Sequence, residues 1–318
     1  MRTLAALLAA AALMGTSPPV TTTDVQAPGP NGPLKGTMLS PSNAVPPVVL
    51  MIPGSGPTDR DGNNPMGVKA ASLRLIAEGL AFRGVASVRV DKRGLFGSAA
   101  AVPDANAVTM EDYATDVHSW VSSIRARTGA KCVWLLGHSE GGLVALAASR
   151  EPEGICGLIL VSAPGRPLGT VLREQLHANP ANAPLLDQAD HAITELEAGR
   201  RVDASGLNPA LAPLFRANVQ GFLISAMALD PAKLIAAYRG PVLILQGERD
   251  IQVTKEDAAL LGQAQPKAQL RLLPDTNHVQ KVVTSDDRAA NLATYADPGL
   301  PLAPDVVPDI SRFIRASR

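Results

Sequence analysis

Short apolar runs alternate with amphipathic stretches along most of the chain. Six runs are predominantly apolar and are bounded by turn residues, namely 47–52, 85–90, 132–137, 157–163, 241–247 and 268–273. Two longer stretches between them, 68–84 and 110–129, have helical character. Apolar strands that alternate with helices are typical of a parallel sheet that is covered on both faces. The pattern therefore predicts an α/β fold with a mostly parallel central sheet flanked by helices.

Two segments depart from this alternation. Near the start, residues 20–27 and 34–40 are joined by the sequence PGPNGP, which predicts an antiparallel hairpin. Between Gly165 and Arg239 only helix-like pieces occur, and such a length exceeds any ordinary connection. We expect a helical insertion there, which either shields part of the sheet or caps a functional site.

The first residues have the character of a targeting segment. Arg2 precedes an apolar run from Leu4 to Met14, which is too short to span a bilayer but suits the core of a signal peptide. The alternative is an apolar helix packed on the domain. We expect a signal peptide over residues 1–17, an exported protein that is periplasmic or secreted, and no membrane span in the mature chain.

Composition excludes some partners. The chain carries 29 basic and 29 acidic side chains and only 3% aromatic residues. Proteins that bind nucleic acid usually have a basic excess or aromatic stacking platforms, so no nucleic-acid partner is expected. Cys132 and Cys156 stand near the starts of two predicted strands. They either form a disulfide, which export would permit, or act as two small buried residues.

The strongest chemical signal is the sequence LLGHSEGG. Its residues 137–141 match the pattern G-x-S-x-G between an apolar strand and a helix. A sharp strand-to-helix turn lifts the central hydroxyl above the sheet, and the helix N-terminus directs N–H groups at developing negative charge. Ser139 is therefore the candidate nucleophile.

A serine hydroxyl needs a base to accept its proton. Of the five histidines, His278 follows the last predicted strand in a turn-rich loop, where this type of sheet places its site. His138 should point away from the site because it adjoins Ser139. His118, His177 and His191 lie in predicted helices. His278 is therefore the candidate base.

The orienting acid should follow the preceding strand. The sequence LILQGERDIQV offers Asp250 on a tight turn, with Glu248 as the runner-up and Asp275 as a weaker third choice. The resulting chain order is Ser139, Asp250, His278, which is the order of α/β-hydrolases.

The chain resembles the α/β-hydrolase superfamily, in particular bacterial serine hydrolases of the esterase and serine-aminopeptidase branch. The stretches that carry the resemblance are IPGSGPTDRDGNN, RVDKRGLFGS, GHSEGG, APGRPL, QGERDIQV and NHVQK. The resemblance implies that the insertion is a substrate-covering cap and that Asp91 and Arg93 are structural. The predicted organisation is a hydrolase core over 18–165 and 239–318, with a helical cap over 166–238.

The loop 52–65 admits three interpretations. It lacks the Gly-Lys-Ser/Thr of a phosphate loop, and Ala70 stands where a calcium loop needs a glutamate. The remaining interpretation is an oxyanion loop. We expect the backbone N–H of Ser55, or alternatively of Gly56, to act with that of Glu140, and the charged residues 59–61 to hold the loop through internal bonds. No cofactor or metal is expected.

The predicted activity is hydrolysis of carboxylic esters with small or medium acyl groups through an acyl-enzyme. The same residues would also suit a peptidase, an amidase or an acyltransferase. A peptidase that binds a substrate ammonium would need nearby acids, for which Glu140 and Glu174 are candidates, although both are expected to be solvated or paired. The alternative from another class is a catalytically silent binding protein with a hydrolase fold. The oligomeric state is not predicted.

Overall fold

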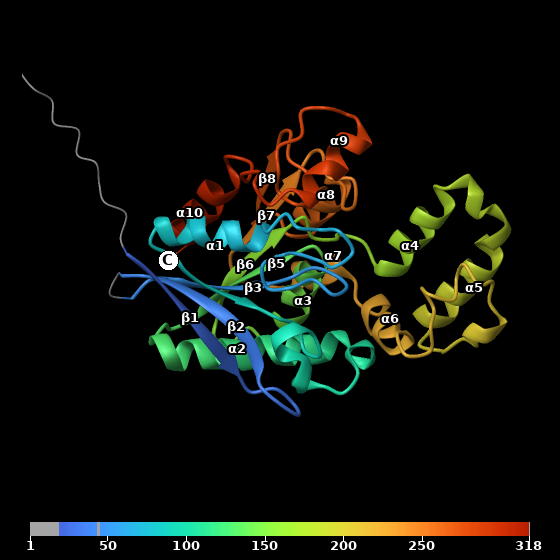
Figure 1. Ribbon diagram of the computed structural model, residues 1–318, viewed down its shortest axis with the longest axis horizontal. Coiled ribbons are helices and arrows are strands. Elements are labelled where there is room, and N and C mark those ends of the chain that lie inside the picture. Colours follow the sequence, from blue (N-terminus) through green and yellow to red (C-terminus); the bar gives the residue numbers. More distant parts are fainter. Residues whose placement is uncertain (1–18, 43–44, 318) are drawn as a thin grey trace, which may run out of the picture.

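A computed structural model describes residues 19–42 and 45–317. The predicted signal peptide over 1–17 lies outside the described residues. Figure 1 shows a central twisted sheet with helices on both faces and a group of helices that projects to one side. None of the described helices combines the length and the apolar character that crossing a bilayer requires.

The sheet has eight strands in the order β1-β2-β4-β3-β5-β6-β7-β8. The strands are β1 (Val20–Ala27), β2 (Leu34–Pro41), β3 (Val48–Ile52), β4 (Ala86–Val90), β5 (Val133–His138), β6 (Ile155–Val161), β7 (Val242–Gly247) and β8 (Gln269–Leu273). The β1–β2 and β2–β4 pairs are antiparallel, and every pair from β4 to β8 is parallel. The predicted hairpin and the mostly parallel α/β sheet are both confirmed.

Helices cover the two faces of this sheet. They are α1 (Ser72–Phe82), α2 (Met110–Thr128), α3 (Glu140–Ala148), α8 (Lys255–Ala264) and α10 (Val306–Ala316). Side chains of α2, α3 and α8 pack on one face, and those of α1 and α10 pack on the other (Figure 1). Residues alternate between these cores along β3, with Leu50 on the first face and Met51 on the second, as the two-residue period of a strand requires.

The helix expected over 68–84 begins later than predicted. Its first residue is Ser72, because the chain before it is fixed in a non-helical conformation. Ala71 has a φ of 51°, and its N–H donates to Asn63 Oδ1 at 3.0 Å. The strand predicted over 157–163 likewise ends at Val161, where the next residue, Ser162, adopts a φ of 48°.

The segment between β6 and β7 is helical. It contains α4 (Leu168–His177), α5 (Leu186–Glu197), α6 (Gln220–Met227) and α7 (Pro231–Ala237). A core that includes Ile193 and Phe215 joins α5, α6 and the loop between them. In contrast, Ile235 on α7 belongs to the main core beside the sheet. The division at 165/166 and at 238/239 remains a prediction.

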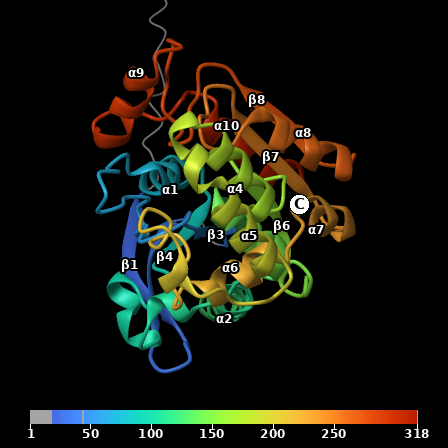
Figure 2. The ribbon, with the colours of Figure 1, turned by 90° about the vertical axis from the view of Figure 1, so that its right-hand side faces the viewer.

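The projecting helices stand beyond the edge at which the parallel strands end. In Figure 1, β6 leads directly into α4 at that edge, and Figure 2 shows α4, α5 and α6 in front of the strands when the molecule is viewed from that side. The remaining elements are α9 (Arg288–Ala293) and the 3₁₀ turns η1 (Phe96–Ala101), η2 (Ala105–Ala107), η3 (Pro180–Leu185), η4 (Ala204–Gly206) and η5 (Thr294–Ala296).

A disulfide joins Cys132 to Cys156, which resolves the two alternatives left open by the sequence. The two residues lie at the starts of the parallel neighbours β5 and β6, with their Cα atoms 5.1 Å apart. The bond closes a loop that contains all of β5 and α3, and thus also the turn at Ser139.

We expect the Cys132→Ser/Cys156→Ser variant to lose about 2–4 kcal/mol of unfolding free energy, because the bond restricts a loop of moderate length in the unfolded chain. Urea denaturation, monitored by circular dichroism, measures this loss. Reductant should lower the midpoint of the wild type and leave that of the double variant unchanged. Equal midpoints for the oxidised wild type and the variant would contradict the expectation.

Candidate active site

Ser139 occupies a strained turn between β5 and α3. Its φ and ψ are 56° and −125°, a conformation that L-residues rarely adopt. The surrounding glycines are required by close backbone contacts. A Cβ at residue 137 would lie 2.1 Å from the carbonyl oxygen of Gly141, and a Cβ on Gly141 would lie 2.3 Å from that of Ile52. The G-x-S-x-G spacing therefore reflects a turn pressed against the end of β3.

Asp250 and His278 form a buried pair. Asp250 follows β7 and His278 follows β8, and the His278 Nδ1–H donates to Asp250 Oδ2 at 2.8 Å. The other carboxylate oxygen accepts from the backbone N–H groups of Gln252 at 2.8 Å and Val253 at 3.0 Å. Gln246 on β7 also donates its side-chain N–H to Asp250 Oδ2 at 3.3 Å. Within the described residues the carboxylate is therefore oriented by its own turn, by the strand that precedes it and by His278.

These contacts keep Asp250 ionised. Burial by itself would raise the pKa of Asp250, but the electrostatic attraction and hydrogen bond of His278 and the two backbone N–H groups together lower this pKa below its usual value. The two alternative acids are placed differently. Glu248 is exposed, and Asp275 lies 3.4 Å from Arg249 in an ion pair.

Ser139 and His278 line one cavity of about 390 Å³. In the described part of the chain no hydrogen bond joins the Ser139 hydroxyl to His278. In ligand-free enzymes such contacts are often long and tighten only around a substrate. The cavity continues between the loop after β3 and the segment after β8. Its apolar lining consists of Met66, Val68, Val279, Leu292 and the ring of Tyr295.

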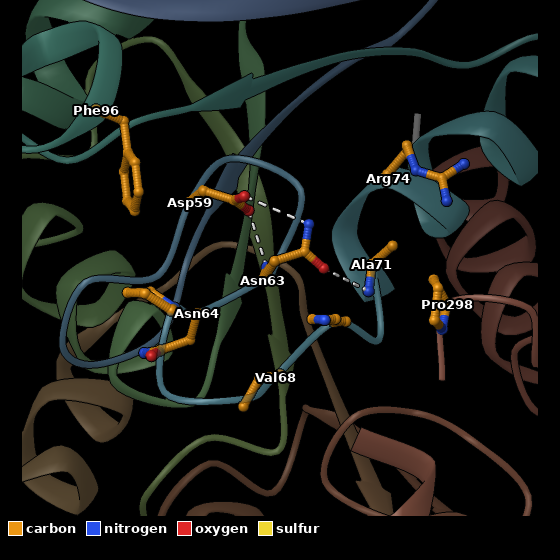
Figure 3. Close-up of a pocket in the computed structure, with 10 residues that line it drawn as sticks. Asp59, Asn63, Asn64, Val68, Ala71, Arg74, Phe96 and Pro298 are labelled. Carbon is orange, nitrogen blue, oxygen red and sulfur yellow. Dashed lines mark hydrogen bonds between the residues drawn. The ribbon is translucent and has the colours of Figure 1, made fainter. Parts of the chain in front are cut away.

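The loop after β3 is held partly by internal bonds and partly by bonds to β4 and the residue that follows it. The expectation of internal bonds is correct for Asp59 and wrong for the side chains of Arg60 and Asp61, which reach Asp91 and Arg89. Asp59 Oδ1 accepts from the N–H groups of Asp61 and Asn63. Figure 3 shows the bonds between Asp59 and Asn63. Arg60 binds the buried Asp91 through its backbone N–H at 3.1 Å and its guanidinium, and Asp61 pairs with Arg89. The structural role that the resemblance implies for Asp91 is therefore observed. For Arg93 it is also observed, through ion pairs with Asp112 and Asp116.

Three backbone amides stand near the Ser139 turn. Ser55 and Gly56 line the cavity, and a Cβ built on Gly54 would lie 3.3 Å from Ser139 Cβ. Glu140 is the first residue of α3. Within the described residues none of the amides of Ser55, Gly56 and Glu140 donates to a protein acceptor.

His138 does not point away from the site, contrary to the expectation from its position. Its Nε2 lies 2.9 Å from the carbonyl oxygen of His278, and the two rings lie with centroids 4.8 Å apart. A carbonyl oxygen only accepts, so Nε2 carries the proton. Burial and the nearby His278 lower the pKa of His138 to about 4, although the hydrogen bond opposes this shift. The sequence gives no sign of this contact because 140 residues separate the partners.

His177 and the acids Glu140 and Glu174 have partners of their own. His177 lies 2.9 Å from Asp190 on the projecting helices. Glu140 lies 3.4 Å from Lys92, and Glu174 pairs with Arg166, so of the two expected states, solvated or paired, the structure shows the paired one for both acids. Among residues 19–42 and 45–317 no group of three or more His, Cys, Asp or Glu side chains is arranged to hold a metal ion.

The fold and the turn at Ser139 define a class, namely an α/β protein with a sharp strand-to-helix turn at the carboxyl edge of a parallel sheet. Comparison with known proteins gives the same class. The model of the alpha/beta hydrolase family matches residues 49–294, which is well over half of the chain. The chain belongs to the α/β hydrolase family.

Individual relatives are more distant. Esterase EstD of Thermotoga maritima is 25% identical over 256 residues, which is 77% of this chain but only 58% of EstD. A thermophilic esterase from Thermogutta terrifontis has a TM-score of 0.56 at 18% identity, covering 93% of this chain and 99% of that one. Proline iminopeptidase from Mycobacterium smegmatis has a TM-score of 0.59 at 17% identity, covering 93% and 98%. The two structural likenesses show the fold alone.

The His138 contact leads to a prediction about stability against pH. Because the pKa of His138 is about 4 in the folded chain and ordinarily 6.5, only the unfolded chain takes up this proton between those values. The contribution of His138 to the stability of the folded chain is therefore complete above pH 6.5 and falls as the pH drops to about 4. His138→Gln, which retains a side-chain N–H donor, should flatten the pH dependence of the urea midpoint across this window.

The exposed His191 provides the matched control. His191→Gln should leave the pH dependence of the midpoint as it is in the wild type. Parallel pH profiles for the wild type and the His138→Gln variant would contradict the assignment of a neutral His138.

Proposed function

We propose that this protein is a serine hydrolase that cleaves carboxylic esters of small or medium acyl groups. The observation that carries the proposal is the pairing of Asp250 with His278 at 2.8 Å beside the cavity that Ser139 also lines. The similarity to EstD over 77% of the chain supports ester hydrolysis as the reaction.

In this proposal the Ser139 hydroxyl attacks the acyl carbon while His278 accepts its proton. Asp250 holds the imidazole orientation and stabilises the imidazolium. The N–H groups of Ser55, or alternatively Gly56, and of Glu140 donate to the oxyanion of the tetrahedral intermediate. His278 then protonates the leaving alcohol, and a water molecule, deprotonated by the same histidine, hydrolyses the acyl-enzyme.

The cavity supports a modest apolar group as the bound part of the substrate. It has a volume of about 390 Å³, at the small end of ligand pockets, and one wall is apolar from Met66 to Leu292. Its lining contains residues of the segments after β3, β5, β7 and β8 and none from 166–238. We propose that the helical segment 166–238 is a cap that limits access to the site. The apolar wall of the cavity is formed by the segments after β3 and β8.

Peptide or amide hydrolysis is the second candidate function, because the same residues serve both reactions. Recognition of a substrate ammonium would need an available carboxylate. Glu140 and Glu174 are both engaged in ion pairs, which favours the ester reaction. A silent binding protein is the third candidate, against which the Asp250–His278 pair counts. Export is proposed from the apolar run at 4–14, and the disulfide is compatible with it.

Ser139→Ala should abolish labelling by a fluorophosphonate probe and lower kcat for p-nitrophenyl butanoate by at least about 10³-fold. Asp250→Asn should lower kcat by a factor on the order of 10³–10⁴ because the amide leaves the imidazole in the wrong tautomer. Active-site labelling and steady-state kinetics measure both effects, and circular dichroism confirms folding. A folded wild type that neither reacts with the probe nor hydrolyses any ester would overturn the proposal in favour of a binding protein.

Ester and amide activities are separated by comparing p-nitrophenyl esters with aminoacyl p-nitroanilides on the same preparation. The proposal expects kcat/KM to be higher for the esters. Faster turnover of the anilides, after correction for their uncatalysed rates, would favour a peptidase.

Leu292→Ala should shift the acyl preference towards longer chains. Leu292 lies on α9 and lines the cavity, so truncation of its side chain enlarges the cavity at the apolar wall. The ratio of kcat/KM for octanoate to that for acetate should rise roughly threefold to tenfold. Leu260→Ala on α8 is the control, since Leu260 is also partly exposed but lies outside the cavity lining. An unchanged ratio in Leu292→Ala would show that the apolar wall does not contact the acyl group.

A further inference from the structure

Lys92 is a buried cation that the proposed reaction leaves without a role. It follows β4 and is only 7% exposed. Its ammonium donates to the carbonyl oxygen of Gly54 at 2.7 Å and lies 3.4 Å from Glu140 Oε1. The ring of Tyr113 lies 5.6 Å from the same nitrogen, within the range of a cation–π contact.

The two acceptors of Lys92 belong to the two halves of the proposed oxyanion hole, one acceptor to each half. The Gly54 carbonyl and the Ser55 N–H are the two ends of one peptide group. The described residues contain no cis peptide bond, so this group is trans and planar and its C=O and N–H point in opposite directions. An ammonium that holds the carbonyl therefore also orients the N–H. The second acceptor is the carboxylate of Glu140, whose backbone N–H is the other donor.

A positive charge on a carbonyl oxygen also strengthens the N–H of the same peptide. Hydrogen bonds in a chain polarise one another, and charge-assisted bonds are the stronger ones. Lys92 is buried, so water screens the effect of the ammonium on Ser55 only weakly. In addition, a Cβ on Gly54 would lie 3.3 Å from Ser139 Cβ, so the peptide that Lys92 holds lies directly against the candidate nucleophile.

We infer that Lys92 is a positioning residue of the oxyanion hole. It holds the Gly54–Ser55 peptide and the first residue of α3 in a fixed relative position, and it polarises the Ser55 N–H. The inference rests on the proposed function. It differs from a merely structural ion pair because it requires the charge to act mainly on the transition state, where the oxyanion exists, and little on substrate binding.

Lys92→Met retains the length of the side chain and removes the ammonium. We expect kcat for p-nitrophenyl butanoate to fall about tenfold to a hundredfold, while KM changes less than about threefold. This decrease in kcat is no larger than the decrease expected when one oxyanion donor is removed. The affinity for a trifluoromethyl ketone, whose hemiketal carries the oxyanion, should fall in proportion to kcat/KM. Lys92→Arg, which keeps the charge, should recover part of kcat.

Lys35→Met is the matched control, because the ammonium of Lys35 binds the side chain of Gln26 on the outer hairpin at 2.7 Å, distant from Ser139 in the sheet order. It should leave kcat, KM and inhibitor affinity unchanged. If Lys92→Met is recovered unfolded, Lys92→Leu, which is also neutral and has no donor, takes its place with the same expectations.

A separate readout does not depend on turnover. In wild type and Lys92→Met labelled with ¹⁵N-serine, the Ser55 amide resonance, assigned through a Ser55→Ala variant, should shift more than the other serine resonances because its peptide loses the bond to the carbonyl. An unshifted Ser55 resonance, or a kcat within twofold of wild type, would overturn the inference while the hydrolase stands. An unlabelled, inactive wild type would instead overturn the proposed function, and the role of Lys92 in an oxyanion hole with it.

Discussion

The close backbone packing around Ser139 is the constraint on which the rest of the site depends. The turn from β5 to α3 lies so close to the end of β3 that residue 141 has no room for a Cβ beside the carbonyl of Ile52. This contact fixes the height of the Ser139 hydroxyl above the sheet. It also brings the loop after β3 against the same serine. One packing contact therefore positions both the candidate nucleophile and the loop that is proposed to stabilise the tetrahedral intermediate.

The parallel sheet supplies the other side chains at the same edge. Because β5, β7 and β8 run in the same direction, the segments that follow them end together, and Asp250 reaches His278 although 28 residues separate them. The two residues are held differently. Asp250 is fixed by amides of its own turn, whereas the carbonyl of His278 is held by His138 from the turn at Ser139.

Buried charges fix the loops that surround this edge. Asp91 holds Arg60, and Lys92 spans the loop after β3 and the start of α3. Buried ions are costly to desolvate, and they persist where several hydrogen bonds compensate for the lost water. Here the compensating partners are backbone and side-chain groups of neighbouring loops, so the same bonds that stabilise each charge also restrict the movement of the loops. The site is thereby organised before any substrate binds.

The pattern along the chain was sufficient for the sheet, the hairpin, the turn at Ser139 and the candidates Asp250 and His278. Strand period and glycine spacing are short-range properties, and the order of the candidates is given directly by the sequence. It did not predict the late start of α1, which depends on the bond between Asn63 and Ala71. It left the disulfide undecided, and it did not reveal the apolar wall that α9 contributes or the contact of Lys92 with Gly54. These features join segments that are distant along the chain, and only the twist and register of the folded sheet decide which of them meet.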